Sequence, residues 1–270
     1  MSDPVGEKFY VAAEAGRVAE VSCVLRDHPE INVNWTNTDT LWTPLHIASL
    51  NGHVEVVKLL LDHPAIDVNM KNNQGPTPFS NGCYRGYVSI VRLLLKDPRV
   101  DVTLDDYYGC TPLWRASFNG SIGVVEWLIA SDRDLGDVKN KKGKWGHQDY
   151  TALEVAREYH NTEVVSLLER FLANPTQTRH ELRVKLGVLD ELSAEIFALT
   201  VFLCDDLLQL KPAATPNPAT ATRFFAIAKR LPMELQMIFC HLAVGSTKQN
   251  ILLKDSEAAF KSLAKSLLSS

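Results

Sequence analysis

The sequence predicts an all-α fold of the solenoid class, built from helix-turn-helix units with projecting loops and followed by a helical C-terminal extension. Two observations predict it. The stretch Thr43–Leu61 recurs as Thr77–Leu95 and as Thr111–Ile129, with a step of 34 residues each time. Each copy opens with Thr-Pro, has a glycine near its middle and closes on an apolar run. A fixed period of this length is typical of stacked repeats that share one continuous core.

Each element of a unit follows from the residues of the second copy. Pro44 suits the first turn of a helix, where a missing N–H is harmless and φ is preset, and Gly52 suits the left-handed position that ends one. The apolar residues of 54–61 recur at helical spacing, and this outer helix ends before Pro64, because the residue before a proline is disfavoured in the α region. Residues 65–75 are rich in turn formers and predict a projecting loop.

Weaker copies at Tyr10–Leu25 and Thr151–Leu168 extend the array to about five units. We place these units at about residues 6–37, 38–71, 72–105, 106–138 and 146–172.

The second unit resembles the ankyrin repeat signature in Thr43–Ala48, Asn51–His53 and Val56–Leu61. Ser80 and Trp114 stand where the third and fourth units would repeat His46. The resemblance implies an ankyrin repeat domain over residues 1–172 that binds a protein partner on its concave face.

The partner site is predicted on the loop tips and the inner helices, which a solenoid leaves open. Aromatic residues and arginine are common there, and these residue types dominate binding energy at interfaces. An alternative for Tyr84, Trp114 and Phe118 is that they fill gaps between neighbouring inner helices. The predicted partner-binding residues are Trp42, Leu50, Asn51, Asn73, Gln74, Tyr84, Arg85, Tyr107, Tyr108, Trp114, Phe118 and Tyr150.

An insertion at Leu135–Tyr150 lengthens the connection between the fourth and fifth units and carries four lysines around Gly143 and Trp145. We expect a flexible basic loop there. Such a loop either binds an acidic or phosphate-bearing group or is simply solvated.

Beyond residue 172 the period is lost. We expect a helical cap over 173–210, with the helix of Asp190–Leu210 burying its apolar stripe against the last repeat, because terminal repeats need covering. The proline-rich stretch 211–222 predicts a linker, and 223–270 a small helical segment.

The segment from Leu231 to Leu242 resembles the opening of an F-box, and an F-box-like segment after ankyrin repeats is similar to the PRANC arrangement of poxvirus ankyrin proteins. This resemblance implies docking to the Skp-type adaptor of an SCF-type ubiquitin ligase. The alternative is that the apolar stripe only packs inside the C-terminal segment. The residues concerned are Leu231, Pro232, Leu235 and Ile238.

Composition excludes several other classes. A net charge of −4 and the lack of a long Lys/Arg run disfavour a nucleic-acid partner, and no apolar run is long enough to predict a membrane span. The five cysteines never form C-x-x-C, which disfavours a metal site or a disulfide framework and favours a cytoplasmic or nuclear protein.

No catalytic motif is present, so we predict a non-catalytic interaction module that needs no cofactor. The alternatives are a ubiquitin-ligase substrate adaptor and a regulatory or inhibitory subunit of an enzyme.

Overall fold

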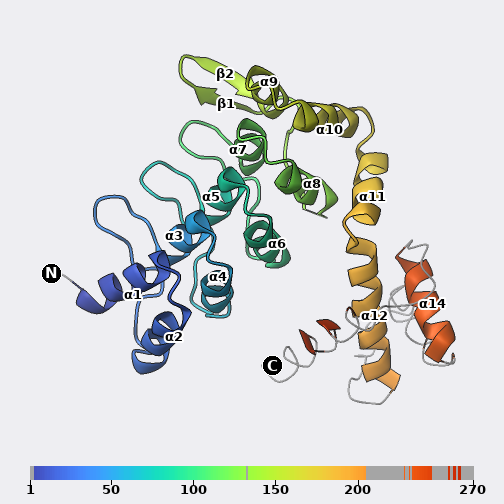
Figure 1. Cartoon of the computed structure of the whole chain (residues 1–270), viewed down its shortest axis with the longest axis horizontal. Helices are drawn as coiled ribbons and strands as arrows, with labels where there is room; N and C mark the ends of the chain where they lie inside the picture. The colour runs from blue at the N-terminus through green and yellow to red at the C-terminus, as the bar shows by residue number, and fades with distance from the viewer. Residues whose placement is uncertain are drawn as a thin grey trace, which may run out of the picture. The chain divides into compact units, whose positions relative to one another are not determined.

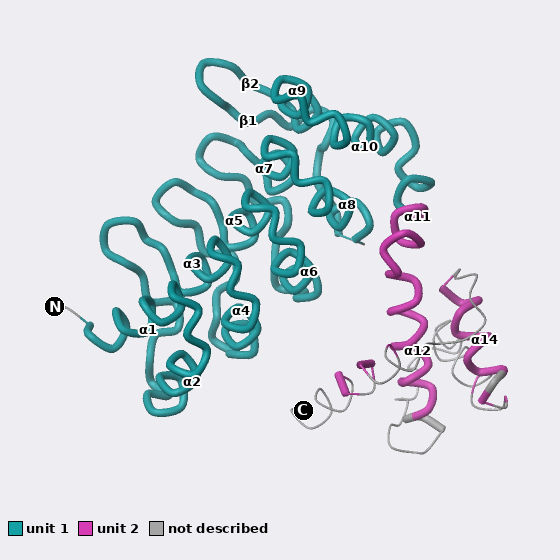
Figure 2. Tube along the Cα trace, in the orientation of Figure 1, with its two compact units in different colours: residues 1–179 teal, residues 180–270 magenta. Residues whose placement is uncertain are grey.

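The computed structural model describes residues 3–131 and 133–204 continuously, and beyond them residues 228, 231, 233–244, 255, 258–259 and 261–262. The chain divides into two compact units, Met1–Arg179 and His180–Ser270 (Figure 2). The predicted linker 211–222 lies outside the described residues.

The first unit is a stack of five helix pairs, which confirms the predicted solenoid. The inner helices lie in one row, the outer helices in a second, and the loops project from the inner row (Figure 1). The pairs are α1 (Pro4–Glu14) with α2 (Val18–Asp27), α3 (Pro44–Asn51) with α4 (Val54–Leu61), α5 (Pro78–Arg85) with α6 (Val88–Lys96), α7 (Pro112–Phe118) with α8 (Ile122–Ala130), and α9 (Ala152–Glu158) with α10 (Thr162–Ala173).

A threonine starts each of the inner helices α3, α5, α7 and α9. The side chain of Thr43 accepts a hydrogen bond from the backbone N–H of His46, and the equivalent threonines of the later units do the same. Such a cap satisfies a backbone donor that the helix itself leaves unpaired. Gly52 ends α3 with a φ of 80°, a left-handed conformation that favours glycine.

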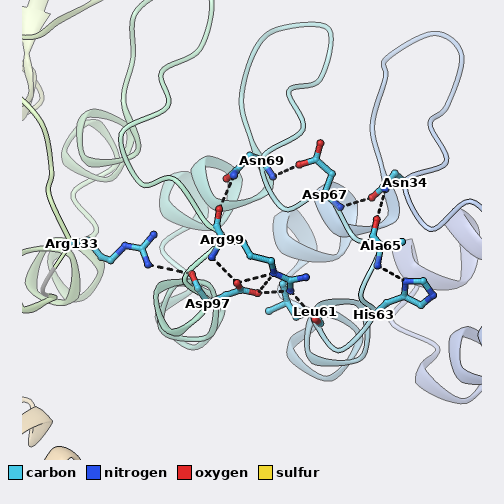
Figure 3. A network of polar contacts seen from close by, with 9 residues as sticks. All are labelled: Asn34, Leu61, His63, Ala65, Asp67, Asn69, Asp97, Arg99 and Arg133. Carbon is cyan, nitrogen blue, oxygen red and sulfur yellow. Dashed lines mark hydrogen bonds and ion pairs between the residues drawn. The ribbon is translucent and has the colours of Figure 1, made fainter. Parts of the chain in front are cut away.

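A ladder of asparagine side chains joins the first three repeats at the base of the projecting loops (Figure 3). Asn34 donates to the carbonyl of Ala65 at 2.8 Å and accepts from the backbone N–H of Asp67 at 2.8 Å. Asn69 repeats this pair with the carbonyl of Arg99, at 2.8 Å, and the N–H of Asp101, at 2.9 Å. One amide side chain therefore bridges two backbone groups of the next repeat at each step.

The ladder changes after the third unit, because Thr103 occupies the position that follows Asn34 and Asn69 in register. Arg133 takes over the connection, and its guanidinium donates to the carbonyl oxygens of Asp97 and Val100.

A two-stranded antiparallel hairpin stands between α8 and α9, formed by β1 (Lys142–Trp145) and β2 (Gln148–Thr151). It occupies the insertion, so the prediction of a flexible loop there was wrong. Gly143 pairs with Tyr150 across the hairpin and lies against Cys110, where a Cβ atom would come within 2.7 Å of the cysteine sulfur. Gly146 turns the hairpin with a φ of 62°.

The boundary between the two units falls within α11 (Pro175–Lys185). Its first part belongs to the first unit, where Arg179 donates to the carbonyl of Ile129 at 2.9 Å and lies over the Phe171 ring.

In the second unit, α12 (Val188–Cys204) packs against α14 (Met233–Ala243). Thr200 and Cys240 meet there at 3.9 Å, and Ala194 and Ala198 are buried beside Ala259. The helix α12 thus packs on α14, a contact that the sequence did not predict.

None of the helices in the described part of the chain is long and apolar enough to cross a membrane.

Candidate protein-binding site

The projecting loop tips of successive repeats are joined by backbone hydrogen bonds. The N–H of Asn73 donates to the carbonyl of Thr40 at 3.0 Å, the N–H of Tyr107 to the carbonyl of Gln74 at 3.4 Å, and the N–H of Lys144 to the carbonyl of Tyr108 at 2.7 Å. The last of these bonds joins the hairpin to the loop tip of the fourth unit. The loops project on the same side of the inner helices (Figure 1), and these bonds join their tips into one edge.

An aromatic cluster centred on Phe118 lies beside this edge. The ring centroid of Phe118 is 4.4 Å from that of Tyr159, 4.7 Å from Trp145, 5.5 Å from Trp114 and 6.5 Å from Tyr84. These distances are in the range of favourable ring pairs. Rings from α5, α7, the hairpin and the end of α9 thus hold one another in place, and we call them the Phe118 cluster.

A pocket of about 610 Å³ opens next to the Phe118 cluster, and we call it the tyrosine pocket. Tyr107 and Tyr108 are 68% and 58% exposed at its rim, and Trp145 is 46% exposed. Exposed aromatic side chains at this density are unusual on a surface that contacts only water. The pocket is lined by Gln74, Tyr107, Tyr108, Cys110, Trp114, Arg115, Lys144, Trp145 and Gly146.

A buried carboxylate shapes this pocket. Asp106 accepts hydrogen bonds from the backbone N–H groups of Tyr108, at 2.8 Å, and Cys110, at 3.0 Å, and pairs with Arg115, whose Nε lies 3.0 Å from its carboxylate. The Arg115 guanidinium in turn lies 5.7 Å from the ring centroid of Tyr84. Asp106 and Arg115 therefore fix the tip that carries the two exposed tyrosines.

The thiols offer no nucleophile at this site. Burial raises the pKa of Cys110 to about 12, with nearby Asp106 acting in the same direction, and burial raises the pKa of Cys83 as well. A thiol must ionise to react or to bind a metal. Within the residues that the structure describes, no group of His, Cys, Asp and Glu is arranged to hold a metal ion.

Trp114 is the one residue of the predicted set that the fold removes from the surface. It is 3% exposed, and its indole N–H donates to the carbonyl of Tyr150 at 2.8 Å. His46 makes the equivalent contact in the second unit, where its Nε2 lies 3.2 Å from the carbonyl of Pro76. This burial favours the alternative that Trp114 packs between neighbouring inner helices, where the longer indole replaces the histidine in bridging the stretched connection to the fifth unit. Contact of Trp114 with a partner stays a prediction.

The lysines of the insertion are partly paired. Lys141 lies 2.6 Å from Asp105, and Lys142 lies 3.9 Å from Glu154. Their charge is thus offset locally, while Lys144 lines the tyrosine pocket.

A second cavity, of about 810 Å³, lies at the N-terminal end of the loop edge, and we call it the acidic groove. Trp42 and Leu50 are half-buried in its wall, and Asn73 and Gln74 lie at its rim. Gln74 also lines the tyrosine pocket, so the two cavities adjoin. The sequence did not single out the other groove residues that matter below, which are Asp3, Glu7, Tyr10, Glu14 and Trp35.

The remaining predicted residues of the first unit are placed near these cavities. Asn51 is exposed and donates to the carbonyl of Glu14 at 3.1 Å. Arg85 is exposed, with its guanidinium 5.9 Å from the ring centroid of Tyr84. Tyr150 is half-buried on the hairpin. The two cavities thus bring seven of the twelve predicted residues together. The other five, Asn51, Tyr84, Arg85, Phe118 and Tyr150, lie outside their walls.

In the second unit, Leu235 and Ile238 are exposed on α14, and Leu231 before it is half-buried. Pro232 lies outside the described residues.

Comparison with known families agrees with the repeat architecture. A family model described as ankyrin repeats (many copies) matches residues 25–80, and one described as ankyrin repeats (3 copies) matches residues 64–142. A search of curated proteins found no match.

Proposed function

The chain belongs to the ankyrin repeat family through residues 25–142, and on this premise we propose that it is a non-catalytic module that binds a protein partner on its loop edge and inner helices. Ankyrin repeats are protein–protein interaction modules, and their open face is the surface they use. The partner contact is centred on the tyrosine pocket.

One observation carries this proposal: exposed tyrosines lie on a hydrogen-bonded loop tip beside a packed aromatic cluster. Tyr107 and Tyr108 protrude at the rim, while the tip beneath them is bonded to buried Asp106 and the neighbouring Phe118 cluster is packed ring on ring. Tyrosine has few rotatable bonds, so ordering it on binding costs little entropy, and its ring supplies a large contact area. A cavity of about 610 Å³ with such a rim suits a protruding side chain of a partner.

The test is quantitative co-purification with the full-length chain from its native host, comparing wild type with Tyr107→Ala/Tyr108→Ala. The variant removes two exposed rings, so folding is expected to be unaffected. The amount of each partner protein recovered with the variant should be at least roughly tenfold lower than with wild type, since loss of a central aromatic contact costs about 2 kcal/mol or more.

Tyr87→Ala is the matched control, because Tyr87 is an exposed tyrosine outside both cavities. Recovery with this variant should equal that of wild type. Equal recovery with the Tyr107→Ala/Tyr108→Ala variant would overturn the proposed site.

A second candidate function concerns α14, where exposed apolar residues follow one helical stripe. Leu235, Ile238 and Leu242 are spaced by three and four residues and are all exposed, together with Met233. An apolar stripe that faces solvent is suited to a partner helix. Together with the resemblance to an F-box, it supports a role as a substrate adaptor that docks a Skp-type protein.

This second role is tested with Leu235→Glu/Leu242→Glu and with Val184→Glu as the control, an exposed apolar position on α11. A Skp-type adaptor should co-purify with wild type and with the control but not with the double variant. If no such adaptor is recovered with wild type, the adaptor role is to be dropped.

A further inference from the structure

We propose that the acidic groove binds an arginine or lysine side chain of an extended segment in the protein partner. The inference rests on the proposed function, since the groove continues the same loop edge, and it adds the chemistry of the partner.

The carboxylates of the groove lie on one face of α1. Asp3, Glu7 and Glu14 follow one another at four and seven residues, with Tyr10 between the last two, and this spacing places them on a single stripe of the helix. All three carboxylates are exposed. From Glu7 to Glu14 the stripe is about 10 Å long, at 1.5 Å per residue.

Within the residues that the structure describes, no cation forms an ion pair with this stripe. The residues lining the groove include no lysine, arginine or histidine. Within the described part of the chain, none of the three carboxylates forms an ion pair, although one oxygen of Asp3 accepts the backbone N–H of Gly6 at 3.0 Å. Like charges that line a concave surface focus their field into it, so the groove attracts a cation. The phenol of Tyr10 lies in the same field, and burial together with nearby Glu14 raises its pKa.

Aromatic rings form the other walls of the groove. Trp35 lies 5.7 Å from Tyr10, ring centroid to centroid, and Trp42 stands further along the wall. Trp35 packs directly on α1 at Gly6, where a Cβ atom would overlap the indole. Glycine at this position therefore lets the indole close over the helix that carries the carboxylates.

Carboxylates beside indole and phenol faces match the two ways in which a guanidinium binds. Its N–H groups pair with carboxylates, and its plane stacks on aromatic rings. A lysine ammonium makes the same interactions without the planar stacking. We therefore expect arginine to bind more tightly than lysine.

The shared Gln74 makes the groove and the tyrosine pocket parts of one surface. Their centres are two to three repeats apart, which is about 20 to 30 Å at a helix spacing of about 10 Å. An extended chain covers this distance in about six to nine residues. The partner segment should therefore have its basic residue about that far from the residue that enters the tyrosine pocket.

The experiment uses the full-length chain and a phage-displayed library of random peptides of about 12 residues, long enough to reach both cavities. Selected peptides are synthesised, and their affinity is measured by fluorescence anisotropy for three proteins and one control variant. These are wild type, Glu7→Gln/Glu14→Gln, and the Tyr107→Ala/Tyr108→Ala variant. The matched control is Glu55→Gln/Glu163→Gln, which removes the same charge from first turns of the outer helices α4 and α10.

We expect the selected peptides to be enriched in arginine over the unselected library. Their affinity should fall roughly tenfold in Glu7→Gln/Glu14→Gln and should weaken as salt is added, while the control variant binds as wild type does.

Two other outcomes overturn the inference and separate it from the proposed function. If the peptides show no enrichment in basic residues and bind Glu7→Gln/Glu14→Gln normally, but lose affinity in the tyrosine variant, the acidic groove is not a site for cations and the proposed function stands. If the library yields no peptide that binds wild type, both proposals fail.

Discussion

Buried His46 should make the folded state lose stability in mildly acidic solution. Burial lowers its pKa from 6.5 to about 4, against the opposing effect of its bond to the carbonyl of Pro76. The backbone N–H of Thr43 points at Nδ1, at 3.2 Å, so Nδ1 is the acceptor and Nε2 carries the proton that is donated to Pro76. A second proton on Nδ1 would face that N–H, and this arrangement favours the neutral ring.

The direction in which stability changes with pH follows from the pKa values of His46 in the folded and unfolded states. The folded pKa lies below the unfolded one, so the unfolded chain takes up the proton first as the pH falls. The stability that neutral, buried His46 contributes to the folded state is therefore fully present above the unfolded pKa of 6.5 and is lost as the pH falls towards 4. Integrated between about pH 7 and pH 5, this single group lowers the free energy of unfolding by about 2 kcal/mol.

The assay is urea denaturation of the full chain at a series of pH values, followed by circular dichroism. His46→Gln keeps a donor that can reach the Pro76 carbonyl but does not titrate. It should be less stable than wild type at neutral pH by about 1 kcal/mol and should show a flatter profile between about pH 7 and pH 5. Carboxylates such as Asp97, whose pKa is lowered by hydrogen bonds from Arg99, contribute at lower pH.

His147→Gln is the control, because His147 is exposed on the hairpin and its replacement should leave the profile unchanged. If His46→Gln and wild type lose stability with the same slope over this range, the argument from the buried ring is refuted.

Three further changes test the contacts between repeats, each by the free energy of unfolding of the full chain. Asn69→Ala removes both side-chain bonds to residues 99–101 and should cost about 1 to 2 kcal/mol; an unchanged value would mean that water replaces the ladder. Gly75→Ala should cost about 1 to 3 kcal/mol, because φ is 97° and the new methyl would lie 2.5 Å from the N atom of Tyr107; a neutral result would contradict the close approach. Trp114→Phe keeps most of the ring packing but removes the bond to the hairpin carbonyl, and should cost about 1 kcal/mol; no loss would show that this bond is not needed.

The repeat architecture could be predicted because its signals are local. The Thr-Pro starts, the glycine stops and the helical spacing of apolar residues each act within a few residues of the chain, and Thr43 and Gly52 take the roles that their residue types favour. The exposure of Tyr107 and Tyr108 at a loop tip follows from the same period. These features depend on the register of the repeat and not on the details of packing.

The hairpin and the role of Trp114 could not be predicted in this way. The insertion reads as a basic, glycine-containing loop, yet Gly143 lies against Cys110 and the N–H of Lys144 is bonded to Tyr108, contacts that exist only once the fourth unit is folded. For Trp114 the sequence allowed either partner contact or packing between inner helices, and only the position of the Tyr150 carbonyl shows that its indole is turned inward.

The acidic groove depends both on features that the sequence predicts and on features that only tertiary packing decides. The sequence is enough to place Glu7, Tyr10 and Glu14 on one helical stripe, because this placement depends only on helix geometry. That Trp35 closes over this stripe, with Trp42 in the wall of the same groove, depends on how the loop packs on α1 at Gly6. The sequence by itself thus determined the repeat, its helices and the side chains carried at each register position. The tertiary structure decided which of those side chains face a cavity together, since that is set by packing between segments tens of residues apart.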